Sequence, residues 1–341
     1  MRRHPVVSAL VLLLLLLAGG VAALVLTARN ELQPVQKDHR QRVLVTVARG
    51  ESLDQLANGL QQQELVRSAF FFKYFAEVKG LQDHLRAGRF RADRGMGPSE
   101  LVAVFEGPPL SRAFDVTVPD GLRAQQEAQL LQSEGLFPAS RYLAVLNSGR
   151  SFPGVTALPG TPTGASWEGF AFGDTYLVDP KVTPAQLLQR QLQDFDAREL
   201  GPITAGAAAV GLSPYQVVVL ASIVSAEAST VKDRGLVAGV FFNRLQAGMP
   251  LQSDVTVLYA QAIAGQGGAP FSSTYPSPYN TYLHSGLPPG PIDSPGGSAI
   301  QAVLHPTSNP YFYFLALANG KVVYSVTLAQ HQQQLQEAGQ G

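Results

Sequence analysis

One acidic residue, Glu227, stands at the end of an unusually apolar stretch of this sequence. Six aliphatic residues precede it within ten positions: Val217, Val218, Val219, Leu220, Ile223 and Val224. This run predicts a buried helix. A carboxylate beside so much hydrocarbon loses hydration, which penalises its charged form and raises its pKa. A carboxyl group that stays protonated near neutral pH can act as a general acid, and the cleavage of a glycosidic bond requires such an acid.

The segment that surrounds this glutamate, residues 220–259, reads LASIVSAEASTVKDRGLVAGVFFNRLQAGMPLQSDVTVLY. It resembles the endolytic murein transglycosylases, the YceG-like family, whose pattern runs roughly ASIVEKE and then VFxNRLxxGMxLQSDPTVxY. The residues that match this pattern are Ala221–Val224, Glu227, Val240, Phe241, Asn243, Arg244, Leu245, Gly248, Met249, Leu251, Gln252, Ser253, Asp254, Thr256, Val257 and Tyr259.

Two positions depart from the family pattern. Ser225 replaces the first glutamate of EKE, so the resemblance assigns the catalytic role to the second glutamate, Glu227. Val255 replaces the usual proline, which changes the local turn and removes no reactive group. The resemblance extends over most of the chain after residue 43. It includes WEGFAFGDTY at 167–176, which is similar to EGYLFPDTY, and the YNTY and GLPPGPI segments within 279–292.

The alternative for Glu227 is a purely structural role. A carboxylate at a helix end can pair with a nearby cation, and Lys232 and Arg234 follow closely in the sequence. A lone glutamate in an apolar helix would favour that pairing. The long match at fixed spacing favours catalysis.

Further candidates for the site lie in the segment LQSD and in the preceding helix. Gln252, Ser253 and Asp254 follow one another in a predicted extended stretch, where amide and short polar groups suit the recognition of hydroxyl and acetamide groups. Arg244 is a candidate for binding a sugar acetamide or lactyl group. Its alternative, which we favour, is an ion pair with Asp254.

A second set of candidates comes from two loops. Asn280 lies in a tyrosine-flanked loop, where its side chain can orient an N-acetyl group. Tyr279 and Tyr282 can stack on sugar faces or simply pack. Glu168 is a candidate helper acid or cleft wall, and a buried hydrogen bond is its alternative.

The resemblance implies a mechanism with a single carboxylate, whereas most glycosidases use two. The acid protonates the oxygen between N-acetylmuramic acid and N-acetylglucosamine. It then removes the proton from the 6-hydroxyl of the muramic acid, which attacks its own C1. The product is a 1,6-anhydro sugar and no water is consumed. Because the nucleophile belongs to the same sugar, proximity takes the place of a second carboxylate.

Two other functions stay open at this point. One is a non-catalytic scaffold that binds the cell wall, against which Glu227, the LQSD segment and Asn280 argue. The other is a muramidase that hydrolyses the same bond with the same acid. The resemblance implies peptidoglycan strands as the substrate, termination of strand elongation as the role, peptidoglycan synthases as partners, and no organic cofactor or metal.

The composition excludes several classes of protein. Lysine plus arginine equals aspartate plus glutamate, at 25 each, so the chain lacks the basic excess of a nucleic-acid-binding protein. There is no cysteine, which rules out disulfides, thiolate metal sites and a cysteine nucleophile. The 6 histidines are scattered and form no HExxH or similar cluster of metal ligands.

The first 28 residues predict a membrane anchor. A short basic head, MRRHP, precedes 23 uncharged residues at 6–28, which include six consecutive leucines. About 20 apolar residues span a bilayer, and basic residues remain on the cytoplasmic side. A cleaved signal peptide is the alternative, although its apolar core is usually only about 7–15 residues. We therefore expect a single-pass protein of the cell membrane, with a cytoplasmic amino terminus and an extracytoplasmic catalytic domain.

The rest of the chain divides into a linker at 29–42, a small module at 43–110 and a catalytic domain at 111–341. The module is predicted as a strand from Val43, a helix over 51–61, a helix with Ser68 as its N-cap, and a strand over 86–90. This order resembles a LysM-like module, which implies binding to the amino-sugar backbone of peptidoglycan. A small packing domain without ligand contacts is the alternative.

Two features are predicted near the carboxyl end. Residues 265–297 are rich in glycine, proline and serine and indicate a long loop, of a kind that is often functional. The Asn319-Gly320 pair predicts a hairpin between strands near 311–314 and 322–326. The expected fold class is therefore α+β: one transmembrane helix, a LysM-like α+β module, and an α+β catalytic domain of the YceG-like kind.

Overall fold

The computed structural model of the chain describes residues 17, 19–20, 25–36, 41–48, 50–110, 113–317 and 319–339. Most of the predicted membrane span, residues 6–28, lies outside the described residues. Within the described part, no single helix has the length and apolar character to cross a membrane. One sharply bent pair of segments, Pro184–Val210 and Pro214–Glu227, meets those two criteria together.

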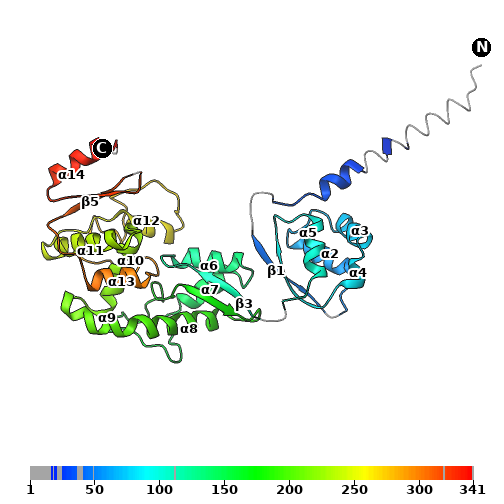
Figure 1. Cartoon of the computed structure of the whole chain (residues 1–341), viewed down its shortest axis with the longest axis horizontal. Helices are drawn as coiled ribbons and strands as arrows, with labels where there is room; N and C mark the ends of the chain where they lie inside the picture. Colours follow the sequence, from blue (N-terminus) through cyan, green and yellow to red (C-terminus); the bar gives the residue numbers. More distant parts are fainter. Residues whose placement is uncertain are drawn as a thin grey trace, which may run out of the picture. The chain divides into compact units, whose positions relative to one another are not determined.

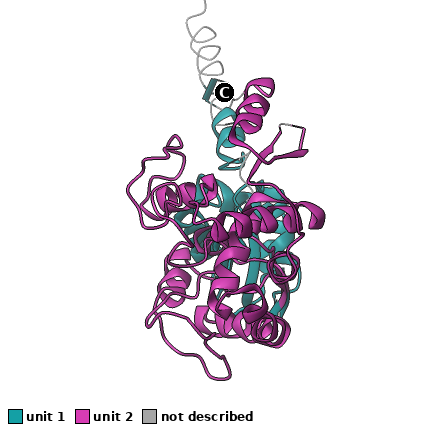
Figure 2. Cartoon of the chain, turned by 90° about the vertical axis from the view of Figure 1, so that its left-hand side faces the viewer, with its two compact units in different colours: residues 1–114, 131–136, 177–181 teal, residues 115–130, 137–176, 182–341 magenta. Residues whose placement is uncertain are grey.

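The chain contains two compact units, coloured separately in Figure 2. Unit 1 comprises Met1–Phe114, Leu131–Leu136 and Leu177–Lys181, and unit 2 comprises Asp115–Leu130, Phe137–Tyr176 and Val182–Gly341. Every residue that the sequence singles out for catalysis or substrate binding belongs to unit 2.

Between residues 41 and 110, the described part of unit 1 contains a two-stranded antiparallel sheet and four helices. These elements are β1 (Arg42–Val47), α2 (Leu53–Gln62), α3 (Ala69–Val78), α4 (Leu81–His84), β2 (Gly88–Asp93) and α5 (Pro98–Glu106). β1 pairs with β2, with Val45 opposite Phe90. The predicted strand, two helices and second strand are all present, and the short helix α4 lies between the second helix and the second strand.

Local signals determine where the helices of unit 1 begin. The Ser52 hydroxyl accepts a hydrogen bond from the backbone N–H of Gln55, and the Gln55 side chain accepts one from the N–H of Ser52 in return. This reciprocal capping satisfies two donors that the first turn of α2 would otherwise leave unpaired. Ser68 caps α3 as predicted. The helices bury their apolar faces in one core with Phe90 and Phe105, whose rings meet edge to face.

From residue 114 onward the chain is mainly helical. Its elements are β3 (Phe114–Val118), α6 (Ala124–Ser133), α7 (Ala139–Leu146), β4 (Asp174–Val178), α8 (Pro184–Phe195), a π-helical turn (Asp196–Leu200), α9 (Gly201–Gly206), a 3-10 turn (Ala207–Val210), α10 (Pro214–Glu227), α11 (Val231–Gln246), α12 (Asp254–Ile263), α13 (Gly297–Leu304), β5 (Tyr313–Ala316), β6 (Val322–Ser325) and α14 (Leu328–Glu337). β3 pairs with β4, and β5 pairs with β6 in an antiparallel hairpin. The mixed α+β class is confirmed in the described residues.

Helix α10 forms the centre of unit 2 and packs against α11 and α13 (Figure 1). Nine of its residues are buried, Tyr215 and the eight from Val217 to Val224. A helix that is apolar all round must be enclosed by other elements, because no side of it can face water favourably. Gly239 of α11 allows the close approach of the segment after α13, since a Cβ there would lie 2.3 Å from the carbonyl oxygen of Thr307.

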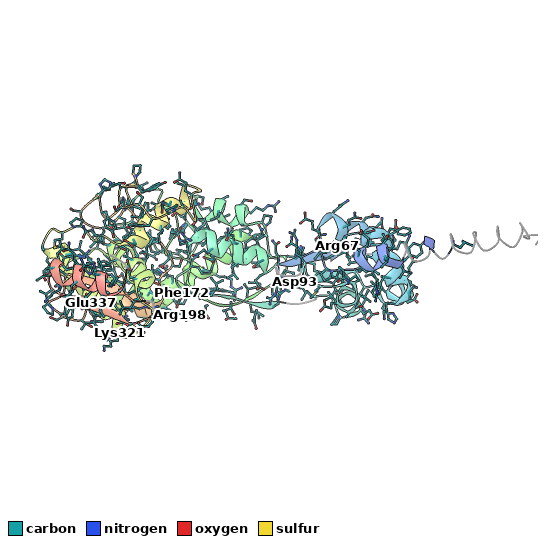
Figure 3. The ribbon with its side chains drawn as sticks, turned by 90° about the horizontal axis from the view of Figure 1, so that it is seen from above. Arg67, Asp93, Phe172, Arg198, Lys321 and Glu337 are labelled. Atoms are coloured by element: carbon teal, nitrogen blue, oxygen red, sulfur yellow. The ribbon has the colours of Figure 1, made fainter. Side chains whose placement is uncertain are left out.

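An exposed cation stabilises the start of β4. Arg198 lies next to Phe172 in Figure 3, with its guanidinium carbon 4.9 Å from the ring centroid. It also forms an ion pair with Asp174 at 2.5 Å. These contacts join the π-helical turn after α8 to the segment that enters β4.

The two features predicted near the carboxyl end are both confirmed. Residues 264–296 contain no helix or strand. The hairpin of β5 and β6 places Phe314 opposite Tyr324, with Gly320 in its turn at φ 80°. Glycine adopts this left-handed conformation without the strain that a side chain would cause.

Candidate active site

Glu227 is the last residue of α10, and local sequence determines both ends of this helix. The Ser213 hydroxyl accepts a hydrogen bond from the N–H of Gln216, and Pro214 occupies the first turn, where proline is tolerated. The chain leaves the helix at Ala228, which has extended backbone angles. A carboxylate at this end also faces the negative end of the helix dipole, which disfavours its charge.

The carboxyl group of Glu227 is held by one short hydrogen bond. Its Oε1 accepts from Ser253 Oγ at 2.6 Å, whereas Oε2 has no hydrogen-bond partner among the described residues. Burial raises the pKa of Glu227 to about 7, and the negative charge of Asp254 adds to this rise. The hydrogen bond from Ser253 and the charge of Arg244 act in the opposite direction. The group can therefore exist in its protonated form at neutral pH.

The ion pair considered as a structural alternative for Glu227 is not formed among the described residues. Neither Lys232 nor Arg234 forms an ion pair with it in the described part of the chain. Arg234 instead donates to the carbonyl oxygen of Ala228 at 2.9 Å and to the hydroxyl of Ser298.

Ser253 is positioned by a small network of threonine hydroxyls. Its backbone N–H donates to Thr281 Oγ1 at 3.0 Å, and its carbonyl oxygen accepts from Thr256 Oγ1 at 2.7 Å. The two threonine hydroxyl oxygens are 2.9 Å apart. Because the backbone of Ser253 is held from both sides, its own hydroxyl has a defined direction toward Glu227.

The residue before Ser253 has strained backbone geometry. Gln252 has φ 48°, a left-handed conformation that residues with a side chain rarely adopt. Its N–H donates to the carbonyl oxygen of Thr281 at 3.0 Å, and its side chain is exposed. Such strain is often found at functional sites. The predicted contact of the Gln252 amide group with a ligand stays a prediction.

Asp254 begins helix α12 and lies beside the acid. Its Oδ1 accepts a hydrogen bond from the hydroxyl of Tyr282. Tyr282 also packs edge to face against Phe271, with 5.7 Å between the ring centroids. The structure thus brings four of the predicted site residues into one cluster: Glu227, Ser253, Asp254 and Tyr282.

Arg244 has a different role from the one favoured above. The predicted ion pair with Asp254 is wrong, because the guanidinium of Arg244 is buried and donates to the carbonyl oxygens of Phe312, at 2.6 Å, and of Leu251. It also lies over the ring of Tyr313, 5.2 Å from the centroid. Its hydrogen bond to the carbonyl oxygen of Leu251 holds the first residue of the LQSD segment in place. Its predicted contact with a sugar stays a prediction.

Asn280 is completely buried, and its side chain holds a loop together. Its Nδ2 donates to the carbonyl oxygens of Ser273 and Tyr275, at 2.9 and 2.8 Å, and its Oδ1 accepts from the N–H of Tyr282 at 2.9 Å. These bonds position Thr281 and Tyr282 for the contacts described above. Contact between Asn280 and an N-acetyl group stays a prediction, and the geometry assigns the side chain a positioning role.

Glu168 is buried and has no hydrogen bond to Glu227. Its Oε1 accepts from the N–H of Ala124 at 2.8 Å, and its Oε2 accepts from the hydroxyl of Tyr259 at 3.4 Å. Burial raises the pKa of Glu168 to about 8. The ring of Tyr259 contacts that of Tyr279, with centroids 4.9 Å apart. The predicted buried hydrogen bond of Glu168 is confirmed, and Tyr279 packs on the same network.

Sequence reasoning missed several positioning residues. Thr256 and Thr281 lie inside the matched motifs, and their adjacency to Ser253 and Asn280 was the only available signal.

Asp293 is a further buried carboxyl group, hydrogen-bonded to Ser225, the residue that departs from the family pattern. Burial raises the pKa of Asp293 well above its ordinary value. No sequence signal marked this contact, because 68 positions separate the two residues.

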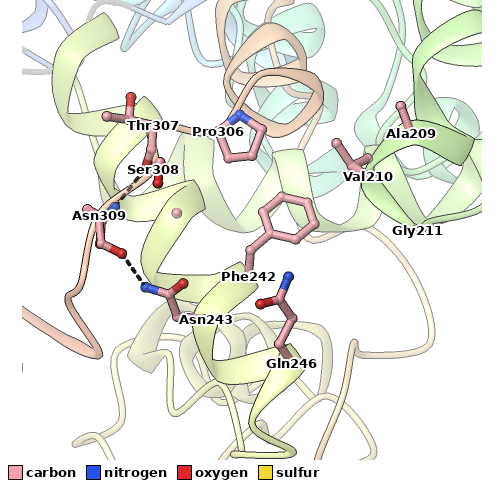
Figure 4. A pocket seen from close by; sticks show the side chains of 11 residues that line it. Ala209, Val210, Gly211, Phe242, Asn243, Gln246, Pro306, Thr307, Ser308 and Asn309 are labelled. Atoms are coloured by element: carbon pink, nitrogen blue, oxygen red, sulfur yellow. Dashed lines mark hydrogen bonds between the residues drawn. The ribbon is translucent and has the colours of Figure 1, made fainter.

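Asn243, which also belongs to the matched pattern, lines a separate pocket of about 530 Å³ (Figure 4). Its Nδ2 donates to the carbonyl oxygens of Asn309 and Tyr311, at 2.9 and 2.8 Å. This pocket contains none of the predicted catalytic or binding residues.

In the described residues, no group of three or more histidine, aspartate or glutamate side chains is arranged to hold a metal ion.

Comparisons with known proteins cover most of the chain. The profile of the YceG-like family matches residues 45–337. An endolytic murein transglycosylase from Bacillus subtilis (strain 168) is 29% identical over 321 residues, which cover 91% of this chain and 89% of that protein. One from Streptococcus pneumoniae serotype 2 is 30% identical, and the match covers 97% of this chain and 64% of that longer protein. A crystal structure of a yceG-like protein from Listeria monocytogenes, 26% identical, superposes with a TM-score of 0.58 and covers 87% of this chain and 100% of that one.

Proposed function

Because the chain belongs to the YceG-like family, we propose that it is an endolytic lytic transglycosylase, which cleaves the bond between N-acetylmuramic acid and N-acetylglucosamine inside peptidoglycan strands. Its relatives are named endolytic murein transglycosylases. The observation that supports this proposal most is the state of Glu227, a carboxyl group with a pKa of about 7 and one oxygen held by Ser253. An acid poised near the working pH is efficient in proton transfer.

The proposed reaction uses Glu227 first as an acid and then as a base. Because Ser253 occupies Oε1, the proton is carried by Oε2 and passes to the glycosidic oxygen as the bond from C1 of the muramic acid breaks. The resulting carboxylate then accepts the proton of the 6-hydroxyl, and the oxygen of that hydroxyl bonds to C1. Glu227 gives one proton to the leaving group and takes one from the 6-hydroxyl, and the bond broken at C1 is replaced by the new bond to the 6-oxygen. The reaction therefore needs no water. The sugar supplies its own nucleophile, so proximity replaces a second catalytic carboxylate.

The nature of the product tests this proposal. Digests of uncrosslinked strands are expected to end in 1,6-anhydromuramic acid, and early digests are expected to contain strands of intermediate length because the cuts are internal. Mass spectrometry separates these ends from hydrolysed ends, which are heavier by one water. Ordinary reducing ends would instead identify the enzyme as a muramidase.

We propose in addition that residues 1–28 anchor the chain in the cell membrane with the catalytic unit outside, and that residues 43–110 act as a LysM-like module that holds glycan. The sheet and helices of unit 1 suit such a module. Tethering raises the effective concentration of the active site near newly made strands. The role would then be to terminate strand elongation beside peptidoglycan synthases, with no part for nucleic acid.

An exported form that starts at Val43 tests the tether. We expect it to cleave isolated strands as the full chain does, because its active site is intact. In cells that carry it as the only copy, nascent strands are expected to be longer than normal, because the enzyme is no longer held at the site of synthesis. The measurement is the strand-length profile of the wall at matched expression. A normal profile would show that tethering is not part of the mechanism.

A further inference from the structure

A separate pocket lies inside the long loop between α7 and β4. The loop spans residues 147–173 without a helix or strand, and the pocket encloses about 330 Å³. The residues that line it include Arg150, Leu158, Thr161, Ser166, Trp167 and Phe170. None of these belongs to the site around Glu227. Pockets of a few hundred Å³ with aromatic walls and a few polar groups are the usual form of small-molecule sites.

Trp167 provides an aromatic surface in this pocket. It is the only tryptophan in the sequence and is half-buried. Its Nε1 donates to the carbonyl oxygen of Arg150 at 2.9 Å, which fixes the orientation of the indole. The rings of Phe152 and Phe170 meet it at 68° and 90°, so neither lies flat upon it. A fixed and partly exposed indole is suited to stacking against the C–H face of a sugar ring.

Thr161 adds a polar group that lacks a partner. Its Oγ1 is buried and has no hydrogen bond. Buried hydroxyl groups are nearly always hydrogen-bonded, and leaving one unsatisfied costs free energy. The backbone N–H of Thr161 donates to the carbonyl oxygen of Leu158, which holds the residue in place at the pocket wall. The hydroxyl therefore lacks a partner at the pocket wall, and a ligand hydroxyl or acetamide that reached it would complete its hydrogen bonding.

The loop that forms the pocket is fastened to the rest of unit 2. The carbonyl oxygen of Pro153 accepts from Gln189 and Gln193 of α8, at 2.9 and 3.1 Å. The N–H of Tyr215 donates to the carbonyl oxygen of Pro159 at 3.2 Å. A pocket with fixed walls binds ligands without first ordering its loop, which favours affinity.

The contact with Tyr215 also relates the pocket to the acid. Tyr215 lies in the first turn of α10 and Glu227 at its end, 12 residues later. At 1.5 Å per residue, this separation is about 18 Å along the helix axis. Only an oligosaccharide of several units could occupy both places, and an internal cut requires an enzyme to hold a strand away from its ends.

We propose that this pocket binds an N-acetylated amino sugar of the glycan strand, several units from the bond that is cleaved. Among the described residues that line it, none is acidic, and the side chains offer an indole face and hydroxyl groups. These groups match the C–H face, hydroxyls and acetamide of such a sugar. The inference rests on the proposed function and adds to it a remote subsite that selects long strands.

The single tryptophan makes the test direct. The full chain carrying Glu227→Gln, which stops turnover, is titrated with uncrosslinked glycan strands while the Trp167 emission is recorded. We expect a saturable shift of the emission. Thr161→Val, which removes only the unpartnered hydroxyl, is expected to weaken binding by about three- to tenfold, the equivalent of one hydrogen bond. Thr156→Val, the same change in the same loop but outside the lining, serves as the matched control and is expected to bind normally.

A kinetic measurement with Glu227 intact separates this inference from the function on which it rests. Thr161→Val is expected to raise KM for long strands more than KM for fragments too short to span about 18 Å. Normal cleavage and strand binding without an emission shift, or equal behaviour of Thr161→Val and Thr156→Val, would overturn the subsite and leave the function standing. A normal emission shift in a wild-type chain that cleaves no strand would overturn the proposed function and support the subsite.

Discussion

A Glu227→Gln variant is expected to lose glycan cleavage by a factor of about 10²–10⁴, the usual contribution of a positioned acid. The carboxamide keeps the shape of the carboxyl group, and its oxygen can still accept the hydrogen bond from Ser253 Oγ. It has no acidic proton to deliver to the glycosidic oxygen. Folding should survive, because the amide keeps the shape of the carboxyl group and its hydrogen bond with Ser253, and because burial already disfavours the charged form of Glu227.

The measurement is the rate at which new strand ends are released, with thermal unfolding as the check on folding. Glu337→Gln on the exposed face of α14 is the matched control, since it makes the same chemical change far along the chain from the site, and it should cleave normally. Near-normal cleavage by a folded Glu227→Gln protein would remove Glu227 from the mechanism. The buried Glu168 would then be the next candidate.

The second large effect is expected in the dependence of the rate on pH. The proposed mechanism requires a protonated Glu227, whose pKa is about 7. The value of kcat/KM should therefore be constant at acidic pH and fall about tenfold per unit above pH 7, which is about 100-fold by pH 9. A rate that rises with pH through this range would contradict the assignment, because it would indicate that the free enzyme needs the carboxylate.

Substitutions of two neighbours of Glu227 should shift the alkaline limb of the profile, which is the fall of kcat/KM above pH 7, in opposite directions. The Ser253 hydrogen bond lowers the pKa of Glu227, so Ser253→Ala should shift the limb to higher pH. The charge of Asp254 raises the same pKa, so Asp254→Asn should shift the limb to lower pH. Both variants are compared with the wild type in pH profiles of kcat/KM on uncrosslinked strands. Coincident limbs would show that Glu227 does not control the profile.

Much of the secondary structure was predictable because its causes are local. The buried helix that ends at Glu227 follows from an apolar run within one segment. The N-caps Ser68 and Ser213 lie next to the helical turns whose N–H groups they accept from. The Asn319-Gly320 turn likewise sets its hairpin from two adjacent residues. Patterns of this kind can be read directly from the chain.

The site was predictable only as a set of residue types. The sequence by itself determined that Glu227 follows an apolar helix and therefore loses hydration, which is the main cause of its raised pKa. It did not determine which residue holds the carboxyl group. The hydrogen bond from Ser253 joins residues 26 positions apart, and it depends on Thr281, a further 28 positions along the chain.

The tertiary structure also decided between roles that the sequence left open. Arg244 and Asp254 have opposite charges, so an ion pair was a reasonable prediction. In the folded chain the Arg244 guanidinium donates its hydrogen bonds to two backbone carbonyl oxygens instead. Asp254 accepts a hydrogen bond from the hydroxyl of Tyr282. Both the nitrogen and the oxygen of the Asn280 side-chain amide form hydrogen bonds with the backbone of its own loop. A buried polar group takes the partners that packing brings within reach, and segments distant in the sequence supply those partners only once the chain has folded.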